Sequence, residues 1–131
     1  MNKTLSIWAV LLGFFIDFIG TEVFFTVLYS LAHLSGADVK TLYYNPLYQI
    51  YAFCMGMGFV SLGGLCAAAR AKFNPILHGC MVGLFSELYF LSQIMNKGIG
   101  DSKLIVICLG LLLSIPMGAL GGFIYKKLQR T

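Results

Sequence analysis

Four long apolar runs account for most of this 131-residue chain, at residues 5–33, 46–69, 75–95 and 104–125. About 20 mainly apolar residues let a helix cross the ~30 Å hydrocarbon core of a bilayer, and each run is at least that long. Only 11% of the residues are charged, against about 25% in a typical soluble domain, so a soluble fold would lack polar surface. The sequence therefore predicts an all-α polytopic membrane protein, with one domain over residues 1–131 and four transmembrane helices.

The first run is predicted to be a retained helix and not a cleaved signal peptide. It extends well beyond the 7–15 apolar residues of a signal peptide and contains two acids, Asp17 and Glu22. Because it is longer than the bilayer is thick, we expect this helix to tilt, to bend near Gly20 or to extend beyond the membrane.

The distribution of lysine and arginine predicts the orientation. Six of the nine basic residues lie on the side that holds both termini, and that side carries no acid. Basic residues are retained in the cytoplasm, so both termini are predicted to be cytoplasmic. The six are Lys3, Arg70, Lys72, Lys126, Lys127 and Arg130, and the other three are Lys40, Lys97 and Lys103.

Two of the runs carry the same pattern, in which two small residues and a carboxylate follow one another at four-residue spacing. The members are Ala9, Gly13 and Asp17 in the first run and Gly79, Gly83 and Glu87 in the third. This spacing places all three residues on one face of a helix. An ionisable group inside a bilayer is expensive and usually functional. Asp17 and Glu87 are therefore predicted to lie at equal depth, to point into the protein and to bind a substrate or ion.

Glu22 is the third acid predicted to take part in substrate or ion binding. It lies about 140° around the first helix from Asp17 and shares its stripe with Thr26 and Ser30. One polar stripe of this helix is expected to pack within the chain, while the other faces a second subunit or a path for water.

Small residues at four-residue steps also mark the second and fourth runs. Such stripes let helix backbones approach closely in lipid. Pro116 lies within the fourth stripe and is expected to kink that helix. The residues predicted to pack helices together are Gly13, Gly56, Gly64, Gly83, Gly118 and Gly122.

The two halves of the chain resemble each other in their small residues. A shift of 70 residues places Asp17 on Glu87, and a shift of 58 places Gly63-Gly64 on Gly121-Gly122. These shifts predict two tandem hairpins of the same orientation, related by an axis along the membrane normal.

Two resemblances concern known families. The segment GGLCAAAR at residues 63–70, followed by His78-Gly79, resembles a pattern in small uncharacterised bacterial four-helix membrane proteins. The five residues from Asp17 to Thr21 (DFIGT) resemble the first helix of small multidrug resistance transporters, where an essential acid precedes Ile-Gly-Thr. The second resemblance implies a transport role for Asp17.

No enzyme or cofactor chemistry is expected. Cys54, Cys66, Cys80 and Cys108 form no C-x-x-C pair, and no histidine lies three or four residues from any of them. The chain therefore lacks the usual spacing of a metal or redox site. Its net charge of +4 comes from the residues that flank the helices, so a nucleic-acid partner is not expected either.

Two functions remain open from the sequence. In the first, the protein is a small transporter or channel, expected to be a homo-oligomer, whose intramembrane carboxylates bind a proton or another cation. In the second, it is a non-catalytic accessory subunit of a larger membrane complex, and its acids bind polar or basic groups on partner helices. The chain supplies three intramembrane acids and no intramembrane base to pair with them, which favours transport.

The orientation can be tested with single cysteines in a background that lacks the native ones. A cysteine in place of Lys72 or Arg130 should react with an impermeant thiol reagent only after the cells are permeabilised. A cysteine in place of Lys40 or Asp101 should react in intact cells. Labelling of position 72 in intact cells would contradict both the orientation and the equal depth of Asp17 and Glu87.

Overall fold

The computed structural model describes residues 5–71, 73–97 and 104–130. Four long helices, α1 (Ile7–Leu34), α3 (Pro46–Ala71), α4 (Pro75–Lys97) and α5 (Leu104–Leu128), confirm the predicted all-α fold. α1 continues through Gly20 and α5 through Pro116, so neither residue ends its helix. Four charged residues used to predict the orientation, Lys3, Lys72, Asp101 and Lys103, lie outside the described residues.

A short helix, α2 (Val39–Tyr44), lies in the first connection and was not predicted from the four apolar runs. The Asp38 carboxylate caps it by accepting hydrogen bonds from the Lys40 N–H (3.0 Å) and the Thr41 hydroxyl (2.8 Å). These bonds hold the pKa of the exposed Asp38 carboxyl below its ordinary value. The turn before it uses Gly36 in the left-handed region, at φ 78°.

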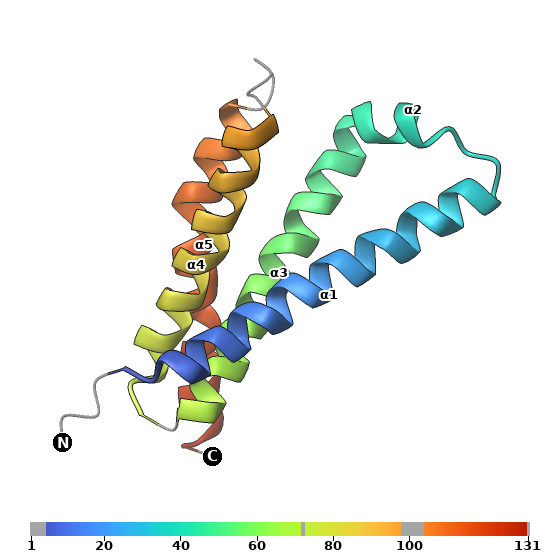
Figure 1. Cartoon of the computed structure of the whole chain (residues 1–131). Helices are drawn as coiled ribbons and strands as arrows, with labels where there is room; N and C mark the ends of the chain where they lie inside the picture. Colours follow the sequence, from blue (N-terminus) through green and yellow to red (C-terminus); the bar gives the residue numbers. More distant parts are fainter. Residues whose placement is uncertain (1–4, 72, 98–103, 131) are drawn as a thin grey trace.

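The helices form two consecutive hairpins that diverge from a common end (Figure 1). α4 and α5 run side by side, whereas α1 and α3 lean away from them and carry α2 at their far end. Both termini lie at the end where the helices converge. α3 contacts α1, α4 and α5, and among the described residues no contact joins α1 to α5. α4 likewise contacts α1, α3 and α5, so α3 and α4 are the two central helices.

Glycines make the closest contacts between helices. A Cβ on Gly13 would lie 2.5 Å from the Gly63 carbonyl oxygen, and a Cβ on Gly63 would lie 2.5 Å from that of Gly13. Three such contacts follow one another along α4 and α5, and a similar contact joins α3 to α5. The pairs are Pro75–Gly122, Gly79–Gly118 and Gly83–Ser114 between α4 and α5, and Gly64–Gly118 between α3 and α5.

Gly56 does not share this role. No described atom lies within 4 Å of the position its Cβ would occupy. Its predicted part in helix packing is therefore wrong within this chain. Gly56 lies in the half of α3 nearer α2, and α3 leans away from α4 and α5 toward α2 in Figure 1.

The structure supports only one of the two sequence shifts. Under the 70-residue shift, Gly13 and Gly83 share a setting, because each meets the backbone of the next long helix in the chain. The 58-residue shift does not describe the packing, since Gly63 meets α1 while Gly121 meets Ser61 of α3.

The expected axis between the hairpins also fails, because α3 contacts α4 while α1 does not contact α5 among the described residues. The two hairpins also differ in the residues between their helices. Small residues keep α4 and α5 close between Pro75 and Gly83 of α4. Aromatic rings hold the outer halves of α1 and α3 apart, with Phe24 lying 5.8 Å from Phe59 and Tyr29 lying 6.2 Å from Tyr48 between ring centroids.

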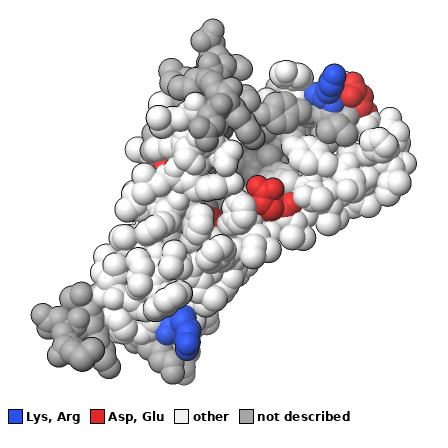
Figure 2. Space-filling view, viewed as in Figure 1, with Lys and Arg blue, Asp and Glu red and all other residues white. Residues whose placement is uncertain are grey.

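The outer surface is that of a multi-pass membrane protein. Large apolar side chains at three- and four-residue steps are exposed along α1, among them Leu12, Phe15, Ile19, Val23, Val27 and Leu31. Figure 2 shows lysine and arginine side chains near the two ends of the molecule and an almost uncharged surface between them. Four segments are long and apolar enough to cross a membrane: Ile7–Leu34, Pro46–Ala71, Pro75–Gln93 and Cys108–Leu128.

The glycine contacts predict a difference between two alanine substitutions. Gly13→Ala would place a methyl group against the Gly63 backbone, so we expect it to lower the free energy of unfolding by about 1–3 kcal/mol. Gly56→Ala meets open space, and alanine favours a helix by about 1 kcal/mol over glycine. This control should be neutral or stabilising. Unfolding in mixed detergent micelles measures both, and equal stability of the two variants would contradict the packing described.

Candidate functional site: two buried carboxyl–serine pairs

Two of the three predicted acids are buried in the bundle. Asp17 is 6% exposed and Glu87 is 4% exposed. Each lies one helical turn beyond a glycine that meets another helix, Gly13 or Gly83. The close approach of the backbones at these glycines leaves little room for water or lipid beside either carboxyl group.

Asp17 binds across the contact between α1 and α4. Its Oδ2 makes a short hydrogen bond with the Ser86 hydroxyl of α4, and its Oδ1 accepts a longer one, 3.4 Å, from Thr21. A Cβ on Gly63 would lie 3.1 Å from the Cβ of Asp17. The missing side chain at Gly63 is therefore what makes room for the acid between α1 and α3.

Glu87 makes the equivalent contact between α4 and α5. Its Oε2 lies 2.7 Å from the Ser114 hydroxyl, which is 3% exposed. A Cβ on Gly110 would lie 3.5 Å from the same carboxyl group, which is an ordinary van der Waals contact. The second oxygen, Oε1, is buried and has no hydrogen-bond partner among the described residues.

The two acids lie at the same level but not in one site. Ser86, which binds Asp17, directly precedes Glu87, so the levels differ by about one residue's rise of 1.5 Å. Successive residues of a helix point about 100° apart, so Ser86 faces α1 while Glu87 faces α5. The structure places Asp17 and Glu87 on two sides of α4, inside the protein.

Glu22 belongs to neither pair. It is exposed on α1 and takes part in neither carboxyl–serine hydrogen bond. Figure 2 shows acidic side chains on the surface at mid-height of the molecule, between its charged ends. Glu22 therefore differs from the two buried acids in its exposure.

The partners Ser86 and Ser114 were not predicted as site residues. Ser114 was expected only to pack helices, as a small residue in the stripe of the fourth run, and no role was predicted for Ser86. A serine next to an intramembrane acid was the available signal for Ser86. Ser114 depends on which helix faces Glu87, and the sequence does not give that register.

His78 is fully buried. Its Nε2 accepts a 2.9 Å hydrogen bond from the Ser6 N–H at the start of α1, and its Nδ1 lies 3.0 Å from the Asn74 carbonyl. The Phe73 ring packs edge-on at 5.1 Å. A neutral imidazole with its hydrogen on Nδ1 makes both bonds. His78 therefore ties the first turn of α1 to the first turn of α4.

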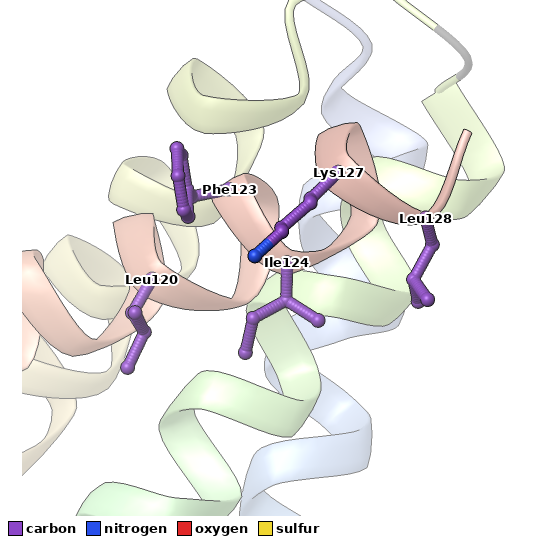
Figure 3. A pocket seen from close by; sticks show the side chains of 5 residues that line it. All are labelled: Leu120, Phe123, Ile124, Lys127 and Leu128. Carbon is purple, nitrogen blue, oxygen red and sulfur yellow. The ribbon is translucent and has the colours of Figure 1, made fainter. Parts of the chain in front are cut away.

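In the described part of the chain, no three His, Cys, Asp or Glu side chains lie together as metal ligands, and the four cysteines are unpaired. A shallow, mainly apolar depression lies on the C-terminal part of α5, with Lys127 extending along it (Figure 3). Its lining includes neither buried acid.

No protein-family model, curated protein or solved structure matches the chain.

The His78 contacts predict a structural role that the second histidine lacks. His78→Phe keeps an aromatic ring but leaves the Ser6 N–H without its acceptor, so it should lower the free energy of unfolding by roughly 1–3 kcal/mol. His33 is exposed on α1, and His33→Phe should have no effect. Unfolding in mixed micelles compares the two. Amide exchange in the first turn of α1 should rise only in His78→Phe, and equal exchange in both variants would refute the tie.

Proposed function

We propose that this protein is a small membrane transporter or channel that acts as a homo-oligomer and uses intramembrane carboxyl groups to bind a proton or another cation. The observation that carries this proposal is the pair of buried carboxyl groups at one level of the bundle, each on a serine hydroxyl. In the described part of the chain, no basic side chain pairs with either acid.

The absence of a basic partner among the described residues helps to distinguish a role in ion binding from a role in helix packing. An amide or a hydroxyl could make the same hydrogen bond without the desolvation cost of an acid. Intramembrane acids that are not held by a salt bridge commonly mark ion or proton paths. The carboxyl groups therefore favour a role in binding over a role in holding helices together.

Glu22 supports assembly with further copies of the chain. An exposed carboxyl group on a membrane-spanning helix needs polar surroundings, such as water or a polar group on another subunit. The outer half of α1 also has no buried residue after Asp17. A ring or pair of copies that covers this half would surround Glu22 with protein or water.

The same observation favours the second candidate function. If Glu22 binds a polar or basic group on an unrelated helix, the protein is an accessory subunit of a larger membrane complex. Purification in mild detergent distinguishes the two, because a transporter should purify as copies of this chain alone. A fixed ratio of another membrane protein that is lost in Glu22→Gln would support the accessory role.

The cellular location belongs to the same proposal. We place the protein in a bacterial inner membrane with both termini in the cytoplasm, on the strength of the lysine and arginine distribution. The resemblances to small bacterial four-helix membrane proteins and to small multidrug resistance transporters agree with this location. The second also agrees with a transport role for Asp17.

Flux in liposomes tests the proposed function directly. Asp17→Asn and Glu87→Gln keep size and hydrogen bonding, so both variants should assemble normally yet lose proton- or cation-driven flux by at least about tenfold, an effect of roughly 1.4 kcal/mol or more. Asp38→Asn changes an exposed acid of the connection and should keep wild-type flux. Wild-type flux in both Asp17→Asn and Glu87→Gln would refute the proposal.

A further inference from the structure

Each serine hydroxyl of the two pairs contacts two oxygen atoms. Ser114 Oγ lies 2.7 Å from Glu87 Oε2 and 2.8 Å from the Gly110 carbonyl oxygen. Ser86 Oγ contacts Asp17 Oδ2 and lies 3.0 Å from the Val82 carbonyl oxygen. A hydroxyl group has one hydrogen to donate. If the carboxyl groups were ionised, each serine hydroxyl could donate its hydrogen to only one of its two oxygen neighbours. The serine oxygen and the other neighbour would then lie in contact with no hydrogen between them.

A proton on each carboxyl group removes this conflict. The acid O–H then donates to the serine oxygen, and the serine hydroxyl donates to the carbonyl four residues earlier in its helix. The carbonyl contact is one that serine commonly makes within a helix. The same arrangement occurs twice, at Ser86 between α1 and α4 and at Ser114 between α4 and α5.

The unpartnered oxygen of Glu87 is a second and independent observation. Glu87 is 4% exposed, and its Oε1 is buried with no donor among the described residues. A buried charged oxygen without a donor is much more costly than a neutral carbonyl oxygen. The groups that face the two acids are Ser86, Thr21 and Gly63 around Asp17 and Ser114 and Gly110 around Glu87, and none carries a charge.

The number of oxygen ligands near each carboxyl group indicates whether the site suits a proton or a metal ion. Hard cations such as Mg²⁺ and Ca²⁺ take six or more oxygen ligands. Each carboxyl group here has one or two hydroxyl groups beside it, and the described residues contain no cluster of three potential ligands. We infer that Asp17 and Glu87 are both protonated in the assembled bundle and that the proton is the cation that these sites bind. The part that names the cargo rests on the proposed function.

Infrared spectroscopy of the full chain in lipid vesicles tests this inference, because a protonated carboxyl group has a carbonyl stretch distinct from the amide and carboxylate bands. At neutral pH, Asp17→Asn should remove one such band and Glu87→Gln another. Asp38→Asn should remove none, since hydrogen bonds from Thr41 and Lys40 to this exposed carboxylate keep its pKa low. Ser86→Ala and Ser114→Ala should each shift the band of their own partner, because the acid loses its acceptor.

The wild-type protein gives a second measurement that does not depend on variants. Carboxyl-labelled aspartate or glutamate, incorporated separately, should each shift a protonated-carboxyl band of the unmodified protein at neutral pH. The absence of a protonated band for aspartate or for glutamate would overturn the inference. Both bands without proton flux in liposomes would leave the protonated sites standing and refute the proposed function. Proton flux without these bands would support the proposed function and overturn the inference.

Discussion

Contact between helix backbones at small residues is the interaction on which this structure depends. In lipid, apolar side chains gain little by leaving their surroundings for another helix, so association relies on close packing and on polar contacts. The chain places glycine where α1 meets α3, where α3 meets α5 and where α4 meets α5 between Pro75 and Gly83. Farther along α1 and α3, the rings of Phe24, Tyr51 and Phe59 pack between the helices.

This packing also determines what the acids can contact. Serine has a short side chain, so its hydroxyl reaches a carboxyl group on another helix only where the two backbones lie close together. Ser86 and Ser114 meet that condition because each acid lies one turn from a glycine contact. Glu22 lies beyond the last buried residue of α1, Asp17, and is exposed. Glycine packing and carboxyl burial are therefore parts of one arrangement.

The sequence predicts those features that depend on local composition. Hydropathy placed the four long helices within about three residues of their observed ends, because transfer into lipid is a property of each segment. The spacing of Gly13 and Asp17 predicted the buried face of α1 for a similar reason. The six-residue helix α2 escaped prediction, because its stability comes from the Asp38 cap and not from a hydrophobic pattern.

Features that depend on which helices face each other could not be predicted in this way. Gly56 has the same spacing as the packing glycines, but the divergence of the two hairpins leaves it without a neighbour among the described residues. The pairing of Glu87 with Ser114, and of His78 with Ser6, depends on a register between helices that small-residue stripes do not specify. The tandem shift of 58 residues failed for that reason too.

The position of Ser86 next to Glu87 makes α4 a mechanical link between the two carboxyl groups. Ser86 binds Asp17 on one side of the helix, and Glu87 binds Ser114 on the other. A rotation of α4 about its axis that withdraws Ser86 from Asp17 must also move Glu87 relative to Ser114. Any ligand that binds one carboxyl group more tightly in one rotational state then changes the affinity of the other, and thermodynamic linkage requires the effect to be equal in both directions. Two sites separated by the width of one helix thus share a single conformational variable.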